Sequence, residues 1–251
     1  MSVKVALRQF LPGSAWQILR RSKQRARRLG GIDFGDLRRL SALGNDFGWE
    51  RGLPIDRFYI DAFLAANAQD IGGHVLEAGE DRYVRQFGGD RLTQVDIVDV
   101  YDGNENATII ADLTCADHLP ADTFDCIVLT QTIQMIYDVR AALHNVHRIL
   151  KPGGVFLMTT HGTSRIRRRE GVDNWGEYWH FTSQAIKRLF DETFPEAETE
   201  ITAHGNALST VAFLHGLAAE DLKPQELDHH DPDFELLISA RVVKREHHES
   251  R

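Results

Sequence analysis

The sequence has few of the features that mark secreted, membrane-spanning or nucleic-acid-binding proteins. Its 251 residues include only two cysteines, Cys115 and Cys126, too few for a disulfide framework. No apolar run approaches the roughly 20 residues that span a bilayer, and the amino terminus lacks the apolar core and cleavage site of a secretory signal. The net charge of -8 argues against a general nucleic-acid binder, which carries a basic face. We therefore expect a cytoplasmic protein with no nucleic-acid partner and no stable membrane insertion.

The first part of the chain differs in composition from the rest. Six of the nine residues from Arg20 to Arg28 are basic. Such a run is typical of a solvated helix face or a mobile arm, and it also suits docking to an acidic partner or an anionic membrane surface. We expect residues 1–53 to form a basic helical extension and residues 247–251 a polar tail.

Residues 54–246 alternate apolar strand-like runs with helical patterns. Pro54 is suited to open a helix, and the apolar residues that follow it recur at helical spacing from Ile55 to Leu64. This alternation predicts an α/β fold, a doubly wound and mostly parallel sheet. We expect seven strands, the last of them antiparallel, at residues 74–79, 92–97, 107–113, 124–131, 155–161, 198–204 and 234–244. Further helices are expected at residues 139–150, 182–194 and 207–219.

Polar residues stand at the predicted carboxyl ends of the early strands, where ligands bind in sheets of this kind. The first strand ends in Glu77-Ala78-Gly79, and Asp96 follows Glu77 by nineteen positions. An acidic side chain at about this spacing can accept hydrogen bonds from a ribose diol. Asp96 is also compatible with a capping or turn role, and Asp99 or Asp102 would replace it if the second strand runs longer.

The segment Leu150-Lys151-Pro152-Gly153-Gly154 between a helix and a strand, together with the strand ends, resembles class I S-adenosylmethionine-dependent methyltransferases. The likeness covers roughly residues 70–245 and implies a Rossmann-like fold with S-adenosylmethionine as cofactor. It also implies that Asp112 accepts a hydrogen bond from the adenine amino group, that the Leu113 N–H donates to adenine, and that Gln131 lines the pocket. One departure concerns the family's glycine-rich loop, of which only Gly79 is present. Cofactor-binding residues are thus expected at Glu77, Ala78, Gly79, Asp96, Asp112, Leu113 and Gln131.

The resemblance further implies methyl transfer to a small-molecule acceptor by in-line displacement, without a metal. We expect an oxygen or nitrogen nucleophile, such as that of a sugar or a natural-product intermediate. His161 and His180 are the candidate bases, because the unperturbed pKa of histidine lies nearest the working pH. The aromatic loop that contains Trp175 and Tyr178 is expected to cover the acceptor, with Tyr59 reaching the mouth of the site.

Two other interpretations remain open from the sequence. The reduced glycine loop and the basic segment are compatible with an inactive methyltransferase-like domain that acts as an interaction partner. A nucleotide-sugar or dinucleotide enzyme on a related sheet is disfavoured, because the chain lacks Gly-x-Gly-x-x-Gly. A homo-oligomer is compatible with the sequence.

Overall fold

The computed structural model describes residue 35 and residues 38–166 and 176–245. The chain divides into two units, residues 1–41 and 42–251, and the fold below is that of the second unit. Residues 42–53, which we expected in the extension, belong to this unit, where the backbone N–H groups of Leu43 and Gly44 both donate to the His215 carbonyl at 2.9 Å. The basic run from Arg20 to Arg28 and the polar tail lie outside the described residues.

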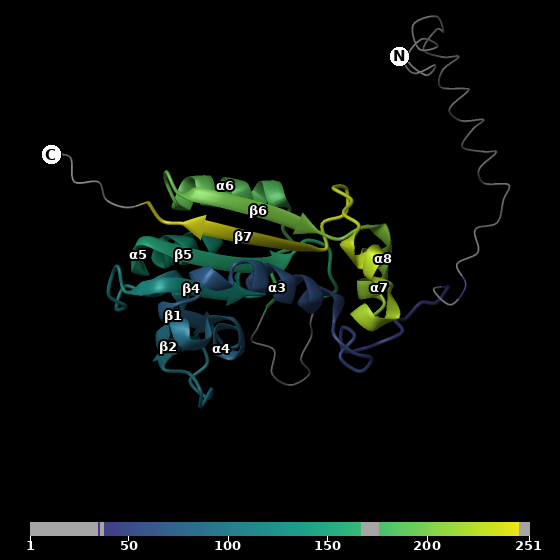
Figure 1. Ribbon diagram of the computed structural model, residues 1–251, viewed down its shortest axis with the longest axis horizontal. Coiled ribbons are helices and arrows are strands. Elements are labelled where there is room, and N and C mark those ends of the chain that lie inside the picture. The colour runs from purple at the N-terminus through teal and green to yellow at the C-terminus, as the bar shows by residue number, and fades with distance from the viewer. Residues whose placement is uncertain (1–34, 36–37, 167–175, 246–251) are drawn as a thin grey trace, which may run out of the picture. The chain divides into compact units, whose positions relative to one another are not determined.

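Seven strands form one sheet in the order β3-β2-β1-β4-β5-β7-β6 (Figure 1). All pairings from β3 to β5 are parallel, whereas β7 runs antiparallel to both β5 and β6. The predicted fold class, a mostly parallel doubly wound sheet with an antiparallel last strand, is therefore confirmed. The strands are β1 (Gly73–Ala78), β2 (Leu92–Asp99), β3 (Ile109–Ile110), β4 (Phe124–Thr130), β5 (Leu150–His161), β6 (Glu198–His204) and β7 (Leu237–Val243).

Helices cover both faces of the sheet because alternate residues of each central strand are apolar on both sides. The helices α5 (Val139–Ile149) and α6 (Ser183–Thr193) pack on one face, against side chains such as Ile127 and Phe156. The other face, with Val128 and Leu157, is covered by α3 (Ile55–Ala66) and α4 (Arg82–Gly88). The helices α7 (Ala207–Leu214) and α8 (Pro224–Asp228) lie at the right-hand end of the sheet in Figure 1. Figure 1 shows α3 crossing in front of the central strands.

Several element boundaries differ from the predicted ones. The strand β2 extends to Asp99, and β3 has only two residues, so the expected 107–113 strand is mostly loop. The predicted helix at 207–219 ends at Leu214, followed by a turn through Gly216 with φ +71°. The strand β5 starts at Leu150, so Lys151 to Gly154 lie within it and do not precede it.

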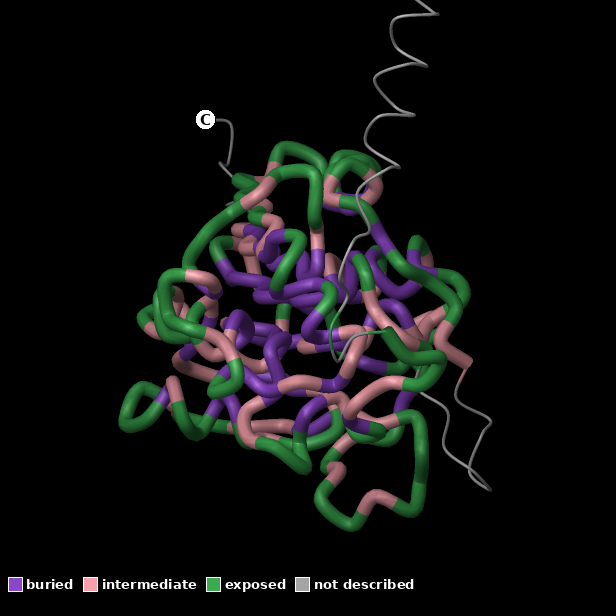
Figure 2. Tube along the Cα trace, turned by 90° about the vertical axis from the view of Figure 1, so that its right-hand side faces the viewer, coloured by how far each residue is buried: buried purple, intermediate pink, exposed green. Residues whose placement is uncertain are grey.

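The strand ends that matter for function lie at one edge of the unit. In Figure 1 the β6 arrow points to the right and the antiparallel β7 arrow to the left, so β1, β4 and β5 also end on the right. Figure 2 views this edge directly and shows buried chain segments at the centre with exposed segments around them. Among the described residues, no helix combines the length and apolar character required for a membrane crossing.

Candidate active site

The end of β1 carries a buried carboxyl group, that of Glu77. It is 1% exposed and accepts hydrogen bonds from the backbone N–H groups of Tyr83 (3.3 Å) and Val84 (2.9 Å) in the first turn of α4. Burial raises the pKa of Glu77 to about 8, against the lowering effect of these two hydrogen bonds, and the nearby Glu80 and Asp81 raise it further. A cation bound beside Glu77 would favour the ionised form of this carboxyl, so cation binding here would lower its pKa.

Gly79 follows β1 with an open space beside its α-carbon. Its φ is +78°, a conformation that favours glycine, and a β-carbon built there meets no atom within 4 Å. Asn104 fixes the turn, because its side-chain amide donates to both the Gly79 carbonyl and the Asp99 carboxylate at 2.7 Å. A ligand can thus approach the backbone of this turn closely.

The prediction that Asp96 stands at the end of the second strand is wrong. Asp96 lies three residues before the end of β2, and its partner across the ladder is Leu76. Its carboxylate contacts His74 Nε2 at 2.6 Å and accepts a hydrogen bond from the Thr108 hydroxyl at 2.7 Å. Partial burial raises the pKa of Asp96, but these contacts lower it, and the net result is a pKa below the ordinary value. The Asp96 carboxylate of β2 therefore already contacts a side chain of β1 and a side chain of the loop before β3.

Asp99 occupies the position at the end of β2. The backbone N–H of Gly79 donates to the carbonyl of Val98, which places the first residue after β1 beside the end of β2. One Asp99 oxygen accepts from the Tyr101 N–H at 2.9 Å and the other from Asn104. The alternative that the sequence left open, a longer second strand ending at Asp99, is the one that the structure has.

Asp112 and Leu113 follow β3 at the same edge of the sheet. Asp112 is exposed and caps a short 3-10 helix, Leu113–Cys115, by accepting from the Thr114 N–H at 2.8 Å. Leu113 is buried, and its carbonyl accepts from the Asn145 amide at 2.9 Å. The structure thus brings both residues to the edge where the turn after β1 lies.

Gln131, directly after β4, begins a chain of buried polar contacts. It has φ +50°, which is uncommon for a residue other than glycine, and its backbone N–H donates to the Thr159 carbonyl. Its side-chain oxygen accepts from Gln134 at 2.9 Å, and Gln134 in turn accepts from the Thr160 hydroxyl at 3.0 Å. The Gln131 amide also reaches the buried carboxylate of Asp56 in α3 at 3.5 Å. These contacts rigidly join the ends of β4 and β5 to α3.

His161 is the last residue of β5, and the two predicted base candidates lie together. The His161 and His180 rings are 6.1 Å apart, and Glu177, which the sequence reading missed, lies near both. No local sequence pattern marks Glu177, because its contact with His161 depends on how the loop folds back onto β5. Tyr178 is 52% exposed and packs edge-on against Tyr137, at 5.3 Å between ring centroids.

The other predicted acceptor contacts are Tyr59 and Trp175. Tyr59 is 5% exposed, stacks on His204 and donates its hydroxyl to the Leu227 carbonyl at 2.8 Å. It therefore packs between α3 and the segment around α8, and the expectation that it reaches the mouth of the site is wrong. Trp175 lies outside the described residues.

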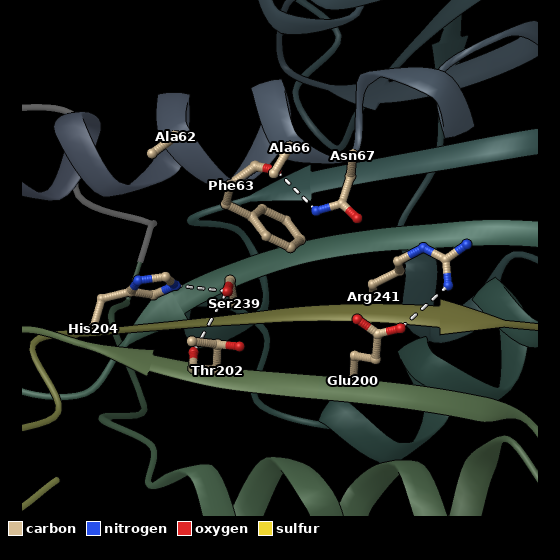
Figure 3. Close-up of a pocket in the computed structure, with 9 residues that line it drawn as sticks. All are labelled: Ala62, Phe63, Ala66, Asn67, Glu200, Thr202, His204, Ser239 and Arg241. Atoms are coloured by element: carbon tan, nitrogen blue, oxygen red, sulfur yellow. Dashed lines mark hydrogen bonds and ion pairs between the residues drawn. The ribbon is translucent and has the colours of Figure 1, made fainter. Parts of the chain in front are cut away.

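A separate cavity of about 260 Å³ lies between α3 and the strands β6 and β7 (Figure 3). His204 Nε2 lies 2.8 Å from the Ser239 hydroxyl, and burial, with a smaller contribution from His230, lowers the pKa of His204 to about 4. The cavity contains no residue of β1, β4 or β5, so it is distinct from the strand ends described above. Its lining consists of Ala62, Phe63, Ala66, Asn67, Glu200, Thr202, His204, Ser239 and Arg241.

Comparison with known proteins gives consistent matches. A family model described as a methyltransferase domain matches residues 41–195. A curated relative, the ubiquinone/menaquinone biosynthesis C-methyltransferase UbiE of Haemophilus ducreyi, is 35% identical over 100 residues, which are 38% of this chain and 36% of that protein. The chain therefore aligns with only about a third of that relative's length.

Among solved structures, one assigned as a sarcosine dimethylglycine methyltransferase from Galdieria sulphuraria matches with a TM-score of 0.52 and 12% identity, covering 75% of this chain and 86% of that one. An S-adenosylmethionine-dependent methyltransferase from Mesorhizobium loti has a TM-score of 0.49 and 17% identity, covering 75% and 97% of the two chains. At 12% identity, the first likeness concerns the fold.

Substitution of Gly79 tests the open turn after β1. We expect Gly79→Ala to weaken binding of S-adenosylmethionine at least tenfold in calorimetry, because the new methyl group projects into the space that a ligand would use. Gly89→Ala is the matched control, since Gly89 also has a positive φ (+55°) and no atom within 4 Å of an added β-carbon, but lies at the end of α4. Both substitutions place a β-carbon on a residue with positive φ, which strains the backbone. Equal cofactor affinity in the two variants would contradict the assignment of Gly79.

The raised pKa of Glu77 predicts how stability depends on pH. Its carboxyl ordinarily titrates at 4.5 and does so at about 8 in the folded protein, so the folded state holds its proton over a range in which the unfolded state has lost it. The stabilisation is complete below the unfolded pKa and is lost as the pH rises through the folded pKa. The contribution is on the order of 4 kcal/mol.

We expect the free energy of unfolding, measured with urea, to fall less steeply between about pH 5 and pH 9 in Glu77→Gln than in the parent. The exposed-site control Glu192→Gln should keep the parental slope, and a parental slope in Glu77→Gln would refute this assignment.

Proposed function

Because the chain belongs to the methyltransferase domain family, we propose that it transfers a methyl group from S-adenosylmethionine to a small-molecule acceptor with an oxygen or nitrogen nucleophile. The family match covers residues 41–195, which include the strands β1 to β5 and the helices α3 to α6. The observation that carries the proposal is the end of β1, where the buried Glu77 carboxyl and the open turn at Gly79 lie together.

The residues at this edge fit the implied cofactor. S-adenosylmethionine carries two cationic groups, an ammonium and a sulfonium, and Glu77 is a buried acid whose neighbouring charges, Glu80 and Asp81, are also acidic. A bound cation would stabilise the ionised form of Glu77. The space beside Gly79 admits close approach to the backbone, as cofactor binding at the strand ends of such sheets requires.

Other residues at the edge would hold the nucleoside part of the cofactor. Asp99 replaces Asp96 as the proposed acceptor of ribose hydrogen bonds, because it is the acidic residue at the end of β2. Asp112 and the Leu113 N–H are proposed to bind the adenine ring, and Gln131 to line the pocket. This assignment leaves Asp96 a structural role through its contact with His74.

The reaction depends mainly on positioning. S-adenosylmethionine supplies an activated methyl group on a positively charged sulfur. The chain's own residues hold the two reactants at near-attack distance and accept the proton that the acceptor loses. The rigid polar contacts of Gln131, Gln134 and Thr160 at the ends of β4 and β5 suit this positioning task.

A carbon nucleophile is the second candidate. The curated relative from Haemophilus ducreyi is named a C-methyltransferase, and its 35% identity extends over 100 residues of this chain. Chemical analysis of the methylated product would distinguish the two, since a new bond from methyl to oxygen, nitrogen or carbon gives different coupling patterns in its spectrum.

The direct test combines binding and transfer. Calorimetry with S-adenosylmethionine, its demethylated product and NAD should give binding of the first two and none of NAD. Incubation with tritium-labelled S-adenosylmethionine and a deproteinised small-molecule extract of the producing cells should label a low-molecular-weight product. Binding without any labelled product would support the rival interpretation of an inactive interaction domain.

The proposed role of Asp99 gives a prediction with a built-in comparison. We expect Asp99→Ala to weaken cofactor binding by about 1.5–3 kcal/mol, the range for hydrogen bonds to a charged group. Asp96→Ala removes the contacts with His74 and Thr108, so it should lower the free energy of unfolding by about 1–2 kcal/mol while cofactor affinity stays within twofold of the parent. Calorimetry and urea unfolding of both variants check this, and a reversed pattern would return the ribose role to Asp96.

A further inference from the structure

The carboxylate of Glu177 and the imidazole ring of His161 lie in contact at the end of β5. The distance from His161 Nε2 to Glu177 Oε1 is 2.9 Å, and the two side chains are only 11% and 5% exposed. His180 Nε2 lies 4.0 Å from the same oxygen, and its side chain is 37% exposed. Of the two histidines, His161 is therefore the one that the carboxylate contacts directly and shields from solvent.

The loop that carries Glu177 is fixed to both neighbouring strand ends. The backbone N–H groups of Tyr178 and Trp179 donate to the Gln134 carbonyl at 2.9 and 3.2 Å, and that of Phe181 donates to the His161 carbonyl at 3.0 Å. The Trp179 indole N–H also donates to the Ile136 carbonyl at 3.0 Å. These bonds hold the backbone of the residues that follow Glu177. The backbone therefore positions the Glu177 carboxylate beside His161.

The position of the carboxylate determines which ring nitrogen carries the proton. Nε2 lies 2.9 Å from a carboxylate oxygen, in a contact that lacks the geometry of a hydrogen bond. Two unprotonated acceptors at this distance would repel, which favours the hydrogen on Nε2 in the neutral ring. Nδ1 is then the nitrogen with the free electron pair. It is buried and has no hydrogen-bond partner among the described residues. A buried and unpaired acceptor of this kind is costly unless a ligand or water completes it.

Thr159 adds a second unpartnered polar group. Its hydroxyl oxygen is buried and has no partner in the described part of the chain. Thr159 and His161 are two residues apart on β5, so their side chains emerge on the same face of the sheet. Both lie at the strand end beside Gln131, whose backbone N–H donates to the Thr159 carbonyl. Two incomplete polar groups therefore face the same side of the proposed active-site edge.

We propose that His161, held by Glu177, is the base that takes the acceptor's proton at Nδ1, and that the Thr159 hydroxyl hydrogen-bonds the same acceptor group. This inference rests on the proposed function. The acceptor is a neutral hydroxyl or amine: its O–H or N–H proton moves to Nδ1 and its heteroatom uses an electron pair to bond the methyl carbon. The electron pair of the broken carbon–sulfur bond stays on the donor sulfur. Glu177 remains ionised and stabilises the imidazolium that forms, which makes it a positioning residue.

Other titratable groups among the described residues also lie near this strand end. On the same loop, the second titratable group near the ring is His180. On the segment before β7, Glu235 runs beside Gly162, but its carboxylate is bonded to the backbone N–H and the hydroxyl of Ser183. On the side of β4, the groups at the strand end are the neutral amides of Gln131 and Gln134, and the buried carboxylate of Asp56 in α3 lies 3.5 Å from the Gln131 amide. The carboxylate of Glu177 is thus the charge placed to assist proton transfer to His161.

The first experiment measures the tautomer of His161 in the protein without cofactor. Nitrogen chemical shifts of labelled histidine rings, with the His161 signal identified by its loss in His161→Gln, should show the hydrogen on Nε2. In Glu177→Ala the preference for this tautomer should weaken, whereas in the exposed-site control Glu192→Gln it should stay as in the parent. A hydrogen on Nδ1 in the parent protein would overturn the proposal.

The second experiment measures methyl transfer with the labelled donor and the small-molecule extract. His161→Gln keeps an amide in the Nε2 position to contact Glu177 but offers no base, so turnover should fall about 10²–10⁴-fold with cofactor affinity within twofold of the parent. Turnover should fall about tenfold or more in Glu177→Gln, and by a smaller factor in Thr159→Val than in His161→Gln. The fall in His180→Ala should be at least tenfold smaller than the fall in His161→Gln. Parental turnover in His161→Gln, or a larger loss in His180→Ala, would overturn the role of His161. If the parent binds no cofactor and transfers no label, the proposed function fails, whereas the tautomer result still decides whether Glu177 orients the His161 ring.

Discussion

The register of β1 with its two neighbours fixes the geometry of the whole site. Glu77 is paired with Ile97 of β2 on one side and with Val128 of β4 on the other. Because these strands are parallel, their carboxyl ends meet at one edge, and each one-residue slip would turn every side chain of a strand to the opposite face. Glu77 would then lose the two α4 N–H groups that it binds, and its carboxyl would face the other hydrophobic layer. The buried acid and the open turn after it exist only in this register.

Much of the fold was predictable because it depends on local patterns. Residues close in the sequence determine the apolar run of β4 and the helix that begins after Pro54. The same is true of the N-cap at Thr182, whose hydroxyl accepts a hydrogen bond from the Ala185 N–H. The resemblance to methyltransferases is also confirmed, by the family model that matches residues 41–195. The likeness could be seen from the sequence because the segment from Leu150 to Gly154 has a distinctive composition. In the structure this segment forms the beginning of β5 and not a loop before the strand.

The site was less predictable because its contacts join residues far apart in the chain. Asp96 fits the spacing of a ribose ligand, but its contact with His74 on the adjacent strand cannot be read from either segment alone. Tyr59 has the helical spacing of a buried face, yet only the fold shows that Leu227 accepts its hydroxyl hydrogen. Glu177 is one acidic residue in a charged loop until the backbone bonds of the following residues bring it to His161. Element type was thus legible in the sequence, whereas pairing across elements was not.

The departure from the family's glycine-rich loop has an electrostatic consequence. The positions after Gly79 carry Glu80 and Asp81, and both raise the pKa of Glu77, although Asp81 also forms an ion pair with Arg85. Under the proposed function, this environment favours the donor over its product, because the donor loses the charge of its sulfonium when the methyl group leaves. The opposite charge nearby then stabilises the ligand before the reaction more than after it. The acidic loop would therefore weaken product binding relative to donor binding, an effect that additional glycines at these positions would not provide.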